Sequence, residues 1–235
     1  MGLYDRNYIQ EHSGESTYEH ARPSESSLGL FIKQTYQLFA ASLLAASAGA
    51  YVGIGMASIV ASWFWGLVIL EFVFLFGLYA AKRKAGLNMA LLFGFTFLSG
   101  LTLTPLLSSI LGMKGGASIV ANAFILTTVA FGGLSVFAMN TKRDFTTMGK
   151  MLFITLIVVV VAGLINIFFH SPILQLAIAS ISSILFSAFI LYDTQNIIRG
   201  AYETPIEGAI ALYLDFLNLF VSLLQILGIF GSKEE

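Results

Sequence analysis

The chain has 235 residues, a formal net charge of −1, 57% hydrophobic residues and only 11% charged residues. A soluble domain carries roughly a quarter charged residues, so this composition excludes an ordinary soluble protein and indicates an integral membrane protein. The chain contains no cysteine, which excludes disulfide bonds, thiolate catalysis and cysteine-bound metals.

Residues 1–27 are polar and lack the apolar core of a signal peptide, so we expect a polar cytoplasmic tail there. Beyond the tail, uncharged stretches longer than the roughly 20 residues that cross a bilayer alternate with turn signals. Seven membrane-spanning helices are predicted, at residues 28–52, 58–81, 88–111, 117–139, 149–169, 173–198 and 206–230. They form a single all-α domain over residues 28–231, and a short tail, 232–235, follows it.

The first two predicted helices differ in character. The first is rich in alanine and glycine between residues 40 and 50, which predicts close packing against a neighbouring helix. The second carries Glu71 in its interior and the basic cluster Lys82-Arg83-Lys84 at its end. Because Glu71 and Lys82 are about three helical turns apart, they lie on one face of this helix.

The sixth and seventh predicted helices each contain an aspartate, Asp193 and Asp215. A carboxylate at the bilayer centre costs about 2.5–3.5 kcal/mol, so such residues usually face a protein interior and serve a function. A plainer alternative for Asp193 is that it reaches the headgroups or pairs with Arg199. On the seventh helix, polar residues recur at helical spacing and form a stripe that should face inward: Asp215, Asn218, Ser222 and Gln225.

The two aspartates are expected to meet, because the sixth and seventh helices form an antiparallel hairpin. Measured from the turn, Asp193 and Asp215 differ in height by about one helical turn, which side-chain length and tilt can cover. Two carboxylates in a poorly hydrated site do not both ionise easily, so they share one proton. Together with Asn218 they also suit a weak, transient Ca²⁺ site, as conduction requires.

The basic residues predict the orientation. Only Lys114 and Lys233 of the 12 basic residues fall outside if the N-terminus is cytoplasmic, which is a strong positive-inside bias. We therefore expect a multi-pass protein of the cell inner membrane, with its N-terminus in the cytoplasm and its C-terminus on the far side.

Two other classes of membrane protein are disfavoured. His12, His20 and His170 are scattered along the chain and do not indicate a histidine-ligated metal site. A retinal pigment would need a lysine within residues 206–230, and that stretch has none. We expect no resident cofactor and no nucleic-acid partner.

Four segments resemble the signature segments of one family, the transmembrane Bax inhibitor motif (Bax inhibitor-1) family. The segments are "FGFTFLSGLTLTPLL" at 93–107, "FAMNTKRDFTTMGKML" at 137–152, "LYDTQNIIRG" at 191–200 and "ALYLDFLNLFVSLLQILG" at 211–228. The resemblance implies a bacterial-type member with six helices wrapped around a central seventh. It also implies activity as a pH-sensitive calcium leak.

The resemblance implies roles for particular residues. It assigns the aspartate pair that senses pH and gates the channel to Asp193 and Asp215, and the helix-two glutamate of the ion pathway to Glu71. The basic latch of helix two corresponds by spacing to Lys82, but the family usually has arginine there, so Arg83 is a rival. In the closed state, the latch would pair with Asp193 while Asp215 shares the proton. Protonation or cation binding would break this pairing and open a route for Ca²⁺.

Two alternatives to transport remain. The resemblance extends to bacterial relatives associated with membrane-bound proteases. The chain could accordingly regulate such a protease or a cell-stress partner without transport, with "ESTYEHARPSESS" as a docking arm. Tyr192-Asp193 also matches a motif of intramembrane aspartyl proteases, which use one aspartate as acid and one as base. Their glycine-rich second motif is missing before Asp215, so we expect no enzyme.

Overall fold

The computed structural model describes residues 25–84 and 86–231. The tail predicted at 1–27 therefore lies outside the described residues up to position 24, and residues 25–27 already belong to the first helix. The predicted tail at 232–235 also lies outside the described residues.

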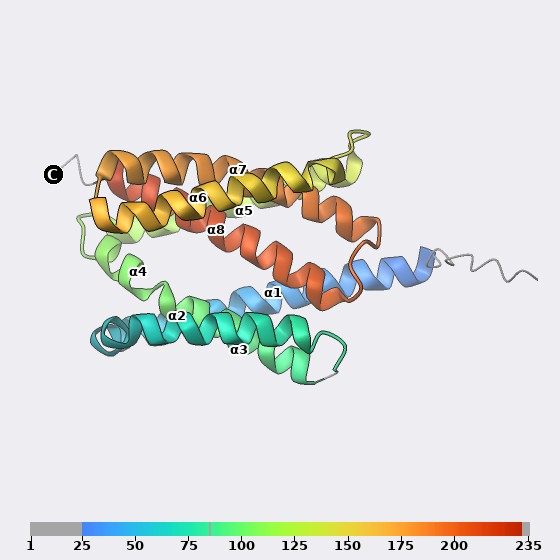
Figure 1. The fold of residues 1–235 in the computed structure, drawn as a ribbon, viewed down its shortest axis with the longest axis horizontal. Coiled ribbons are helices and arrows are strands. Elements are labelled where there is room, and N and C mark those ends of the chain that lie inside the picture. The colour runs from blue at the N-terminus through green and yellow to red at the C-terminus, as the bar shows by residue number, and fades with distance from the viewer. Residues whose placement is uncertain (1–24, 85, 232–235) are drawn as a thin grey trace, which may run out of the picture.

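The described chain is built from helices joined by short turns, and it contains no strand over these residues. The elements are α1 (Glu25–Gly55), α2 (Ala57–Ala80), α3 (Leu87–Thr102), α4 (Thr104–Leu111), α5 (Gly116–Asn140), η1 (Thr146–Met148), α6 (Gly149–Phe169), α7 (Pro172–Ile198) and α8 (Pro205–Gly231). Figure 1 shows them as a bundle of long helices that run roughly along one direction. Seven stretches are long and apolar enough to cross a membrane, as predicted.

The third span is divided into α3 and α4, which the sequence prediction treated as one helix. The break falls at Leu103, just before Pro105, whose ring carries no N–H and crowds the preceding turn. Backbone hydrogen bonds continue across it, from Leu103 N to Ser99 O at 3.1 Å and from Leu107 N to Leu103 O at 3.0 Å. The span is therefore broken at Leu103, but helical hydrogen bonds continue on both sides of Pro105.

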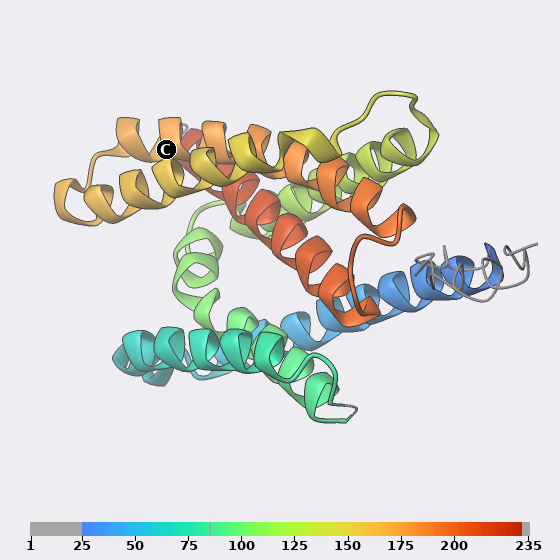
Figure 2. The same cartoon turned by 45° about the vertical axis from the view of Figure 1, so that its right-hand side comes forward.

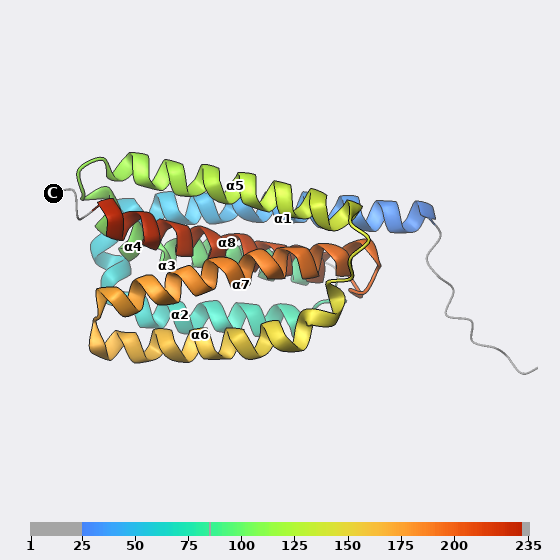
Figure 3. The same ribbon diagram turned by 90° about the horizontal axis from the view of Figure 1, so that it is seen from above.

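Helix α8 lies at the centre of the bundle. In its most apolar stretch 50% of the residues are buried, compared with 6% for α2. It packs against α1, α3, α5 and α7, and Figure 3 shows it in the interior of the bundle. On its remaining side, α2 and α6 contribute to the wall of a cavity. The prediction of six helices around a central seventh is confirmed.

Helices α1 and α3 approach each other closely through small residues. A side chain at Gly100 would collide with the backbone carbonyl of Ala46, and one at Gly49 would collide with the carbonyl of Phe97. Such contacts between glycine and backbone are the usual way for membrane helices to pack tightly. The small-residue surface predicted for the first helix is therefore used in this contact.

The basic turns gather at one end of the bundle, which we call the basic end. Lys82, after α2, forms a salt bridge with Glu207 at the start of α8. Arg199, after α7, forms one with Asp144 in the turn between α5 and α6, at 3.0 Å. In Figure 2, α8 crosses the bundle diagonally between the α6–α7 pair and the side formed by α1 to α3. We call the other end, which holds Ser171, the opposite end.

Candidate functional site

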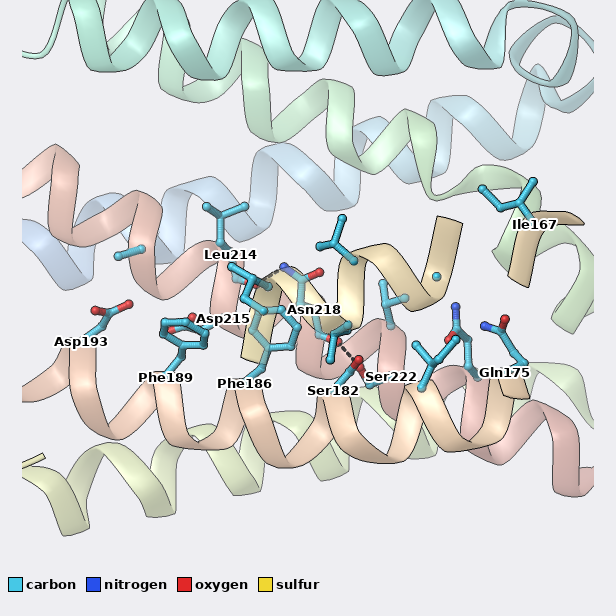
Figure 4. A pocket seen from close by; sticks show the side chains of 18 of the residues that line it. Ile167, Gln175, Ser182, Phe186, Phe189, Asp193, Leu214, Asp215, Asn218 and Ser222 are labelled. Carbon is cyan, nitrogen blue, oxygen red and sulfur yellow. Dashed lines mark hydrogen bonds between the residues drawn. The ribbon is translucent and has the colours of Figure 1, made fainter. Parts of the chain in front are cut away.

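A polar cavity of about 730 Å³ lies beside α8, between α6, α7 and α2. Its α6 wall is apolar, and α2 contributes Tyr79. The polar side chains that line it are Gln175, Ser182, Asp193, Tyr202, Asp215, Asn218, Ser222 and Gln225. Figure 4 shows the side chains of α7 and α8 directed toward one another across this space. The polar stripe predicted on the last helix therefore faces inward, because all four of its members line the cavity.

The cavity extends through much of the membrane depth. Its lining residues on α7 run from Gln175 to Asp193, a length of about 27 Å at roughly 1.5 Å per residue. The hydrocarbon core of a bilayer is about 30 Å thick. The residues that line the cavity therefore span most of the depth of the membrane.

Asp193 and Asp215 meet at the basic end of the cavity. Both are almost completely buried, with 6% and 3% of their surface exposed, and their carboxyl groups interact directly. Asp215 Oδ2 is buried and has no hydrogen-bond partner among the described residues. The structure thus brings together the two aspartates predicted as a pair, and it leaves one of their oxygens without a hydrogen-bond partner in the described chain.

Asn218 and Ser222 continue the polar wall away from the aspartates. Asn218 Nδ2 donates to the Leu214 carbonyl of its own helix at 2.7 Å, and Ser222 Oγ donates to the Asn218 carbonyl at 2.6 Å. These bonds use one of the two N–H donors of Asn218 and the O–H donor of Ser222, and the oxygen lone pairs of both side chains remain for the cavity. Asn218 lies one helical turn beyond Asp215, and its Oδ1 is the nearest neutral oxygen ligand that the stripe supplies.

Tyr202 closes the cavity at the basic end. Its hydroxyl donates to Asp193 Oδ1 at 2.6 Å from the loop that joins α7 to α8. Burial, together with the neighbouring charge of Asp193, raises the pKa of this hydroxyl far above its usual range. Tyr202 therefore stays protonated and serves as a hydrogen-bond donor, a role that the sequence analysis missed.

A cluster of four charges, which we call the clamp, ties the Tyr202 loop to the end of α2. Lys82 Nζ lies 2.7 Å from Glu207 Oε1 and 3.2 Å from Glu203 Oε2, and Arg83 Nη2 lies 2.6 Å from Glu203 Oε2. The hydrogen bond to Glu207 raises the pKa of Lys82, and the hydrogen bond from Arg83 lowers the pKa of Glu203. Lys82 and Glu203 therefore remain charged near neutral pH.

Glu207 also belongs to the start of α8. Its Oε2 accepts hydrogen bonds from the backbone N–H groups of Glu203 at 2.9 Å and Thr204 at 3.1 Å, while its own N–H donates to Thr204 Oγ1 at 3.4 Å. This reciprocal arrangement is a capping box, and the sequence Thr204-Pro205-Ile206-Glu207 is its signature. That signature could have drawn attention to Glu207.

The latch predicted from the sequence has different partners in the structure. Lys82 and Arg83 were expected to pair with Asp193, but over the described residues their salt bridges go to Glu203 and Glu207. The loop carboxylates are closer to the end of α2 and more exposed, so pairing with them costs less desolvation than pairing with a buried aspartate. The connection from α2 to Asp193 is indirect and runs through the loop and Tyr202.

Glu71 lies apart from the cavity, although we predicted it in the ion pathway. Thr102 Oγ1 at the end of α3 donates to Glu71 Oε2 at 2.8 Å, and Glu71 is not among the residues that line the cavity. The contact between α2 and α3 holds it there. Helical spacing placed Glu71 on the same face as Lys82 but could not tell which helix that face meets.

The described residues bring together no group of three or more histidine, cysteine, aspartate or glutamate side chains that could hold a metal ion. The predicted cation site on Asp193 and Asp215 has only two carboxylates. With so few charged ligands, a divalent cation would depend on Asn218, backbone carbonyls or water for the remainder of its shell.

Comparison with known proteins gives consistent matches. The family model described as Inhibitor of apoptosis-promoting Bax1 matches residues 28–232. The chain is 63% identical to an uncharacterized protein of Campylobacter jejuni, over 99% of this chain and 100% of that protein. It is 40% identical to an uncharacterized membrane protein of Vibrio cholerae, over 86% and 91%. It is also 35% identical to the Golgi anti-apoptotic protein of vaccinia virus, over 68% and 65%.

Proposed function

This chain belongs to the family described as inhibitors of apoptosis-promoting Bax1, the Bax inhibitor-1 family, and we propose that it is a pH-sensitive calcium leak channel gated by Asp193 and Asp215. It is a multi-pass integral membrane protein. The proposal gives it Ca²⁺ and H⁺ as ligands. It places the chain in the cell inner membrane, with the basic end in the cytoplasm and the C-terminus on the far side.

One observation supports the proposal above the others. Two buried aspartates from different helices meet at the basic end of the polar cavity, and Asp215 Oδ2 has no hydrogen-bond partner within the described chain. A buried oxygen without a partner is costly, because it has lost water and gained nothing in return. A cation or a proton would remove that cost, and Ca²⁺ is a hard cation that prefers oxygen ligands.

Competition between a proton and Ca²⁺ would make the leak sensitive to pH. Two neighbouring carboxylates in a poorly hydrated site repel each other, so one of them holds a proton unless a cation neutralises the pair. The other ionisable side chains around the pair are Tyr202 and Tyr79, and both are phenols that stay neutral in the physiological range. The pair itself is therefore the group that responds.

The proposed gate depends on the hydrogen bond from Tyr202 to Asp193. A hydroxyl donates more strongly to a carboxylate than to a neutral carboxylic acid, because charge strengthens the bond. Protonation of Asp193 would weaken the hold on Tyr202 and loosen the loop that closes the cavity at the basic end. We therefore propose that the leak increases as pH falls, and that the clamp limits how far the loop moves from α2.

The experiment is Ca²⁺ flux through purified protein in liposomes, measured from pH 5 to pH 8 for the wild type, Asp193→Asn and Asp215→Asn. Asp193→Asn imitates the protonated state, so its flux should be high at every pH. Asp215→Asn removes the carboxylate oxygen that has no protein partner, so its flux should be low at every pH. Wild-type pH profiles in both variants would rule out the proposed gate.

A second candidate is regulation of a partner protein without transport. The name of the vaccinia virus relative describes that protein as anti-apoptotic rather than as a transporter. Deletion of residues 1–24 tests this candidate, because it leaves α1 complete from Glu25. If the chain acts only through its tail, the truncated protein should lose binding to a membrane protease or stress partner, and wild-type liposomes should show no flux above empty ones.

A further inference from the structure

The polar cavity has a second end, far from the aspartates, where it meets another hollow. A smaller cavity of about 480 Å³ lies beside the turn between α6 and α7 and is lined in part by Asn166 and Ser171. The two cavities share Gly163, Ile167 and Gln175 in their walls. The shared residues mark the place, which we call the neck, where the polar cavity adjoins the smaller cavity at the opposite end of the bundle.

An amide pair spans the neck and has a defined orientation. Asn166 Nδ2 donates to Gln175 Oε1 at 2.8 Å, which joins α6 to α7. Asn166 Oδ1 accepts the backbone N–H of Ser171 at 3.1 Å, so the turn fixes which way this amide faces. Gln175 then keeps both of its amide donors and one lone pair of its oxygen for the space around it.

About one helical turn before Asn166 on α6, Gly163 leaves the neck open. A Cβ atom added at Gly163 would meet no other atom within 4 Å. A helix in the bilayer gains packing from a side chain at such a position, so this open space is not required for the contact between α6 and α7. At the neck, the open space beside Gly163 therefore lies close to uncharged polar side chains.

We propose that Gly163, Asn166 and Gln175 form an uncharged access neck, through which a hydrated divalent cation reaches Asn218 and Asp215 from the opposite end. The inference rests on the proposed function for the identity of the ion, but not for the existence of a water-filled route.

The dimensions suit a hydrated ion. A water molecule occupies about 30 Å³ of liquid, so a cavity of about 730 Å³ has room for a Ca²⁺ ion with its six to eight oxygen ligands. The amide oxygens of the neck can replace single waters without binding the ion tightly, as rapid passage requires. His170 lines the smaller cavity, and the first carboxylates on this route are the aspartates, so only there would the ion lose water for carboxylate oxygens.

Thiol labelling tests the route without any measurement of transport. Because the chain has no cysteine, each engineered cysteine is the sole target. Asn218→Cys reports on the deep cavity, and Ser171→Cys reports on the opposite end. Ile184→Cys is the matched control, because it lies about as deep in the bilayer as Asn218, but on the lipid-facing surface of α7, with 73% of its surface exposed.

The probe is a membrane-impermeant methanethiosulfonate carrying a trimethylammonium group, applied to the side from which Ser171→Cys is labelled. We expect Asn218→Cys to be labelled from that side and Ile184→Cys to remain unlabelled. Absence of labelling at Asn218→Cys, while Ser171→Cys reacts, would overturn the proposal.

A second experiment fills the neck with a large side chain. Gly163→Phe, added to Asn218→Cys, should reduce the labelling rate at least tenfold and should reduce Ca²⁺ flux in the cysteine-free chain equally. Gly132→Phe is the control, because a Cβ atom at Gly132 on α5 would also meet no atom within 4 Å, but this position faces away from the cavity. If Gly163→Phe and Gly132→Phe reduced the labelling rate and the Ca²⁺ flux equally, the proposed neck would be refuted. Labelling that depends on Gly163, in a protein that carries no Ca²⁺, would support the neck and refute the calcium leak.

Discussion

The two sides of α8 are built differently. On one side, Phe216 packs against Phe39 of α1 and Phe131 of α5, with ring centroids 5.9 Å and 5.6 Å away. On the other side, Asp215 and Asn218 face the polar cavity. The first side has rings in edge contact beside a smaller, apolar hollow of about 290 Å³, and the second holds the larger cavity of about 730 Å³.

The two sides differ because lipid affects apolar and polar side chains differently. Apolar side chains gain little from leaving lipid, so the aromatic side of α8 is stabilised mainly by the fit between neighbouring surfaces. Polar side chains must leave lipid whether or not they fit, because lipid offers them no hydrogen bond. The polar stripe therefore places α8 at the centre, and the close-packed side fixes its position there. We therefore expect substitutions on the close-packed side to change mainly the stability of the protein, and substitutions on the cavity side to change mainly permeation.

The largest effect is expected where α1 and α3 touch. In Gly100→Val, the new side chain would strike the backbone carbonyl of Ala46, which cannot move aside as a flexible side chain can. Overpacking typically costs about 1–3 kcal/mol, and a backbone collision belongs at or above the top of that range. Thermal unfolding in detergent, followed by circular dichroism, should show a strongly lowered Tm or no folded protein. Gly132→Val, which meets no atom within 4 Å, should unfold like the wild type.

The next effect is expected at the closed end of the cavity. Tyr202→Phe keeps the ring but removes the hydroxyl that donates to Asp193 at 2.6 Å. A hydrogen bond to a charged group contributes about 1.5–3 kcal/mol, so the equilibrium between closed and open states should shift by a factor of roughly 10 to 150. Ca²⁺ flux in liposomes at pH 8 should rise strongly, while the Tm should change much less than in Gly100→Val.

A double variant sharpens this prediction. Tyr202→Phe removes the hydrogen bond to Asp193, and Asp193→Asn weakens the same bond by removing the charge of its acceptor, so their effects on flux at pH 8 should not add when combined. Fully additive effects would mean that Tyr202 and Asp193 act separately, and the gate would need a different explanation.

A smaller effect is expected at the clamp. Glu207→Gln removes the charge that faces Lys82 but keeps an acceptor for the capping box, since glutamine also serves at that position. The two side chains are 28% and 12% exposed, so solvent partly screens the pair, and Lys82 keeps Glu203 as a partner; flux should therefore rise by at most about fivefold. Glu203→Gln should have a smaller effect, because Lys82 then keeps its shorter contact, 2.7 Å, with Glu207. High salt should screen the clamp in the wild type. It should therefore reduce the difference in flux between the variant and the wild type.

These expectations show which parts of the molecule the sequence could predict. The seven spans, the central last helix and the inward stripe from Asp215 to Gln225 were predictable, because each depends on the avoidance of lipid by polar groups. The meeting of Asp193 with Asp215 was predictable as well, since a short turn between antiparallel helices fixes the relative height of the two residues.

The contacts of loops and of individual helix faces were not predictable in the same way. Lys82 was assigned to Asp193 because both lie near one side of the membrane, but Glu207 is nearer and less costly to pair. Glu71 was placed correctly on its helix, yet its partner, Thr102, depends on how α2 packs against α3. Tyr202 gave no periodic signal at all, because it belongs to a turn of six residues, 199–204, between two helices.

The smallest effect is expected at Asp144, and it separates the proposed pH sensor from other acidic residues. Asp144 lies at the basic end, where hydrogen bonds from Arg199 and Thr146 lower its pKa to about 2. A carboxyl group with a lowered pKa contributes its ion pair above its ordinary value, about 3.8, and loses it only as pH falls toward about 2. Its charge is therefore constant from pH 5 to pH 8. Asp144→Asn should leave the shape of the flux profile in that range unchanged, although the absolute flux can differ slightly. If Asp144→Asn flattened the profile as Asp193→Asn should, pH sensing would have to be assigned to the exposed loops of the basic end and not to the buried pair.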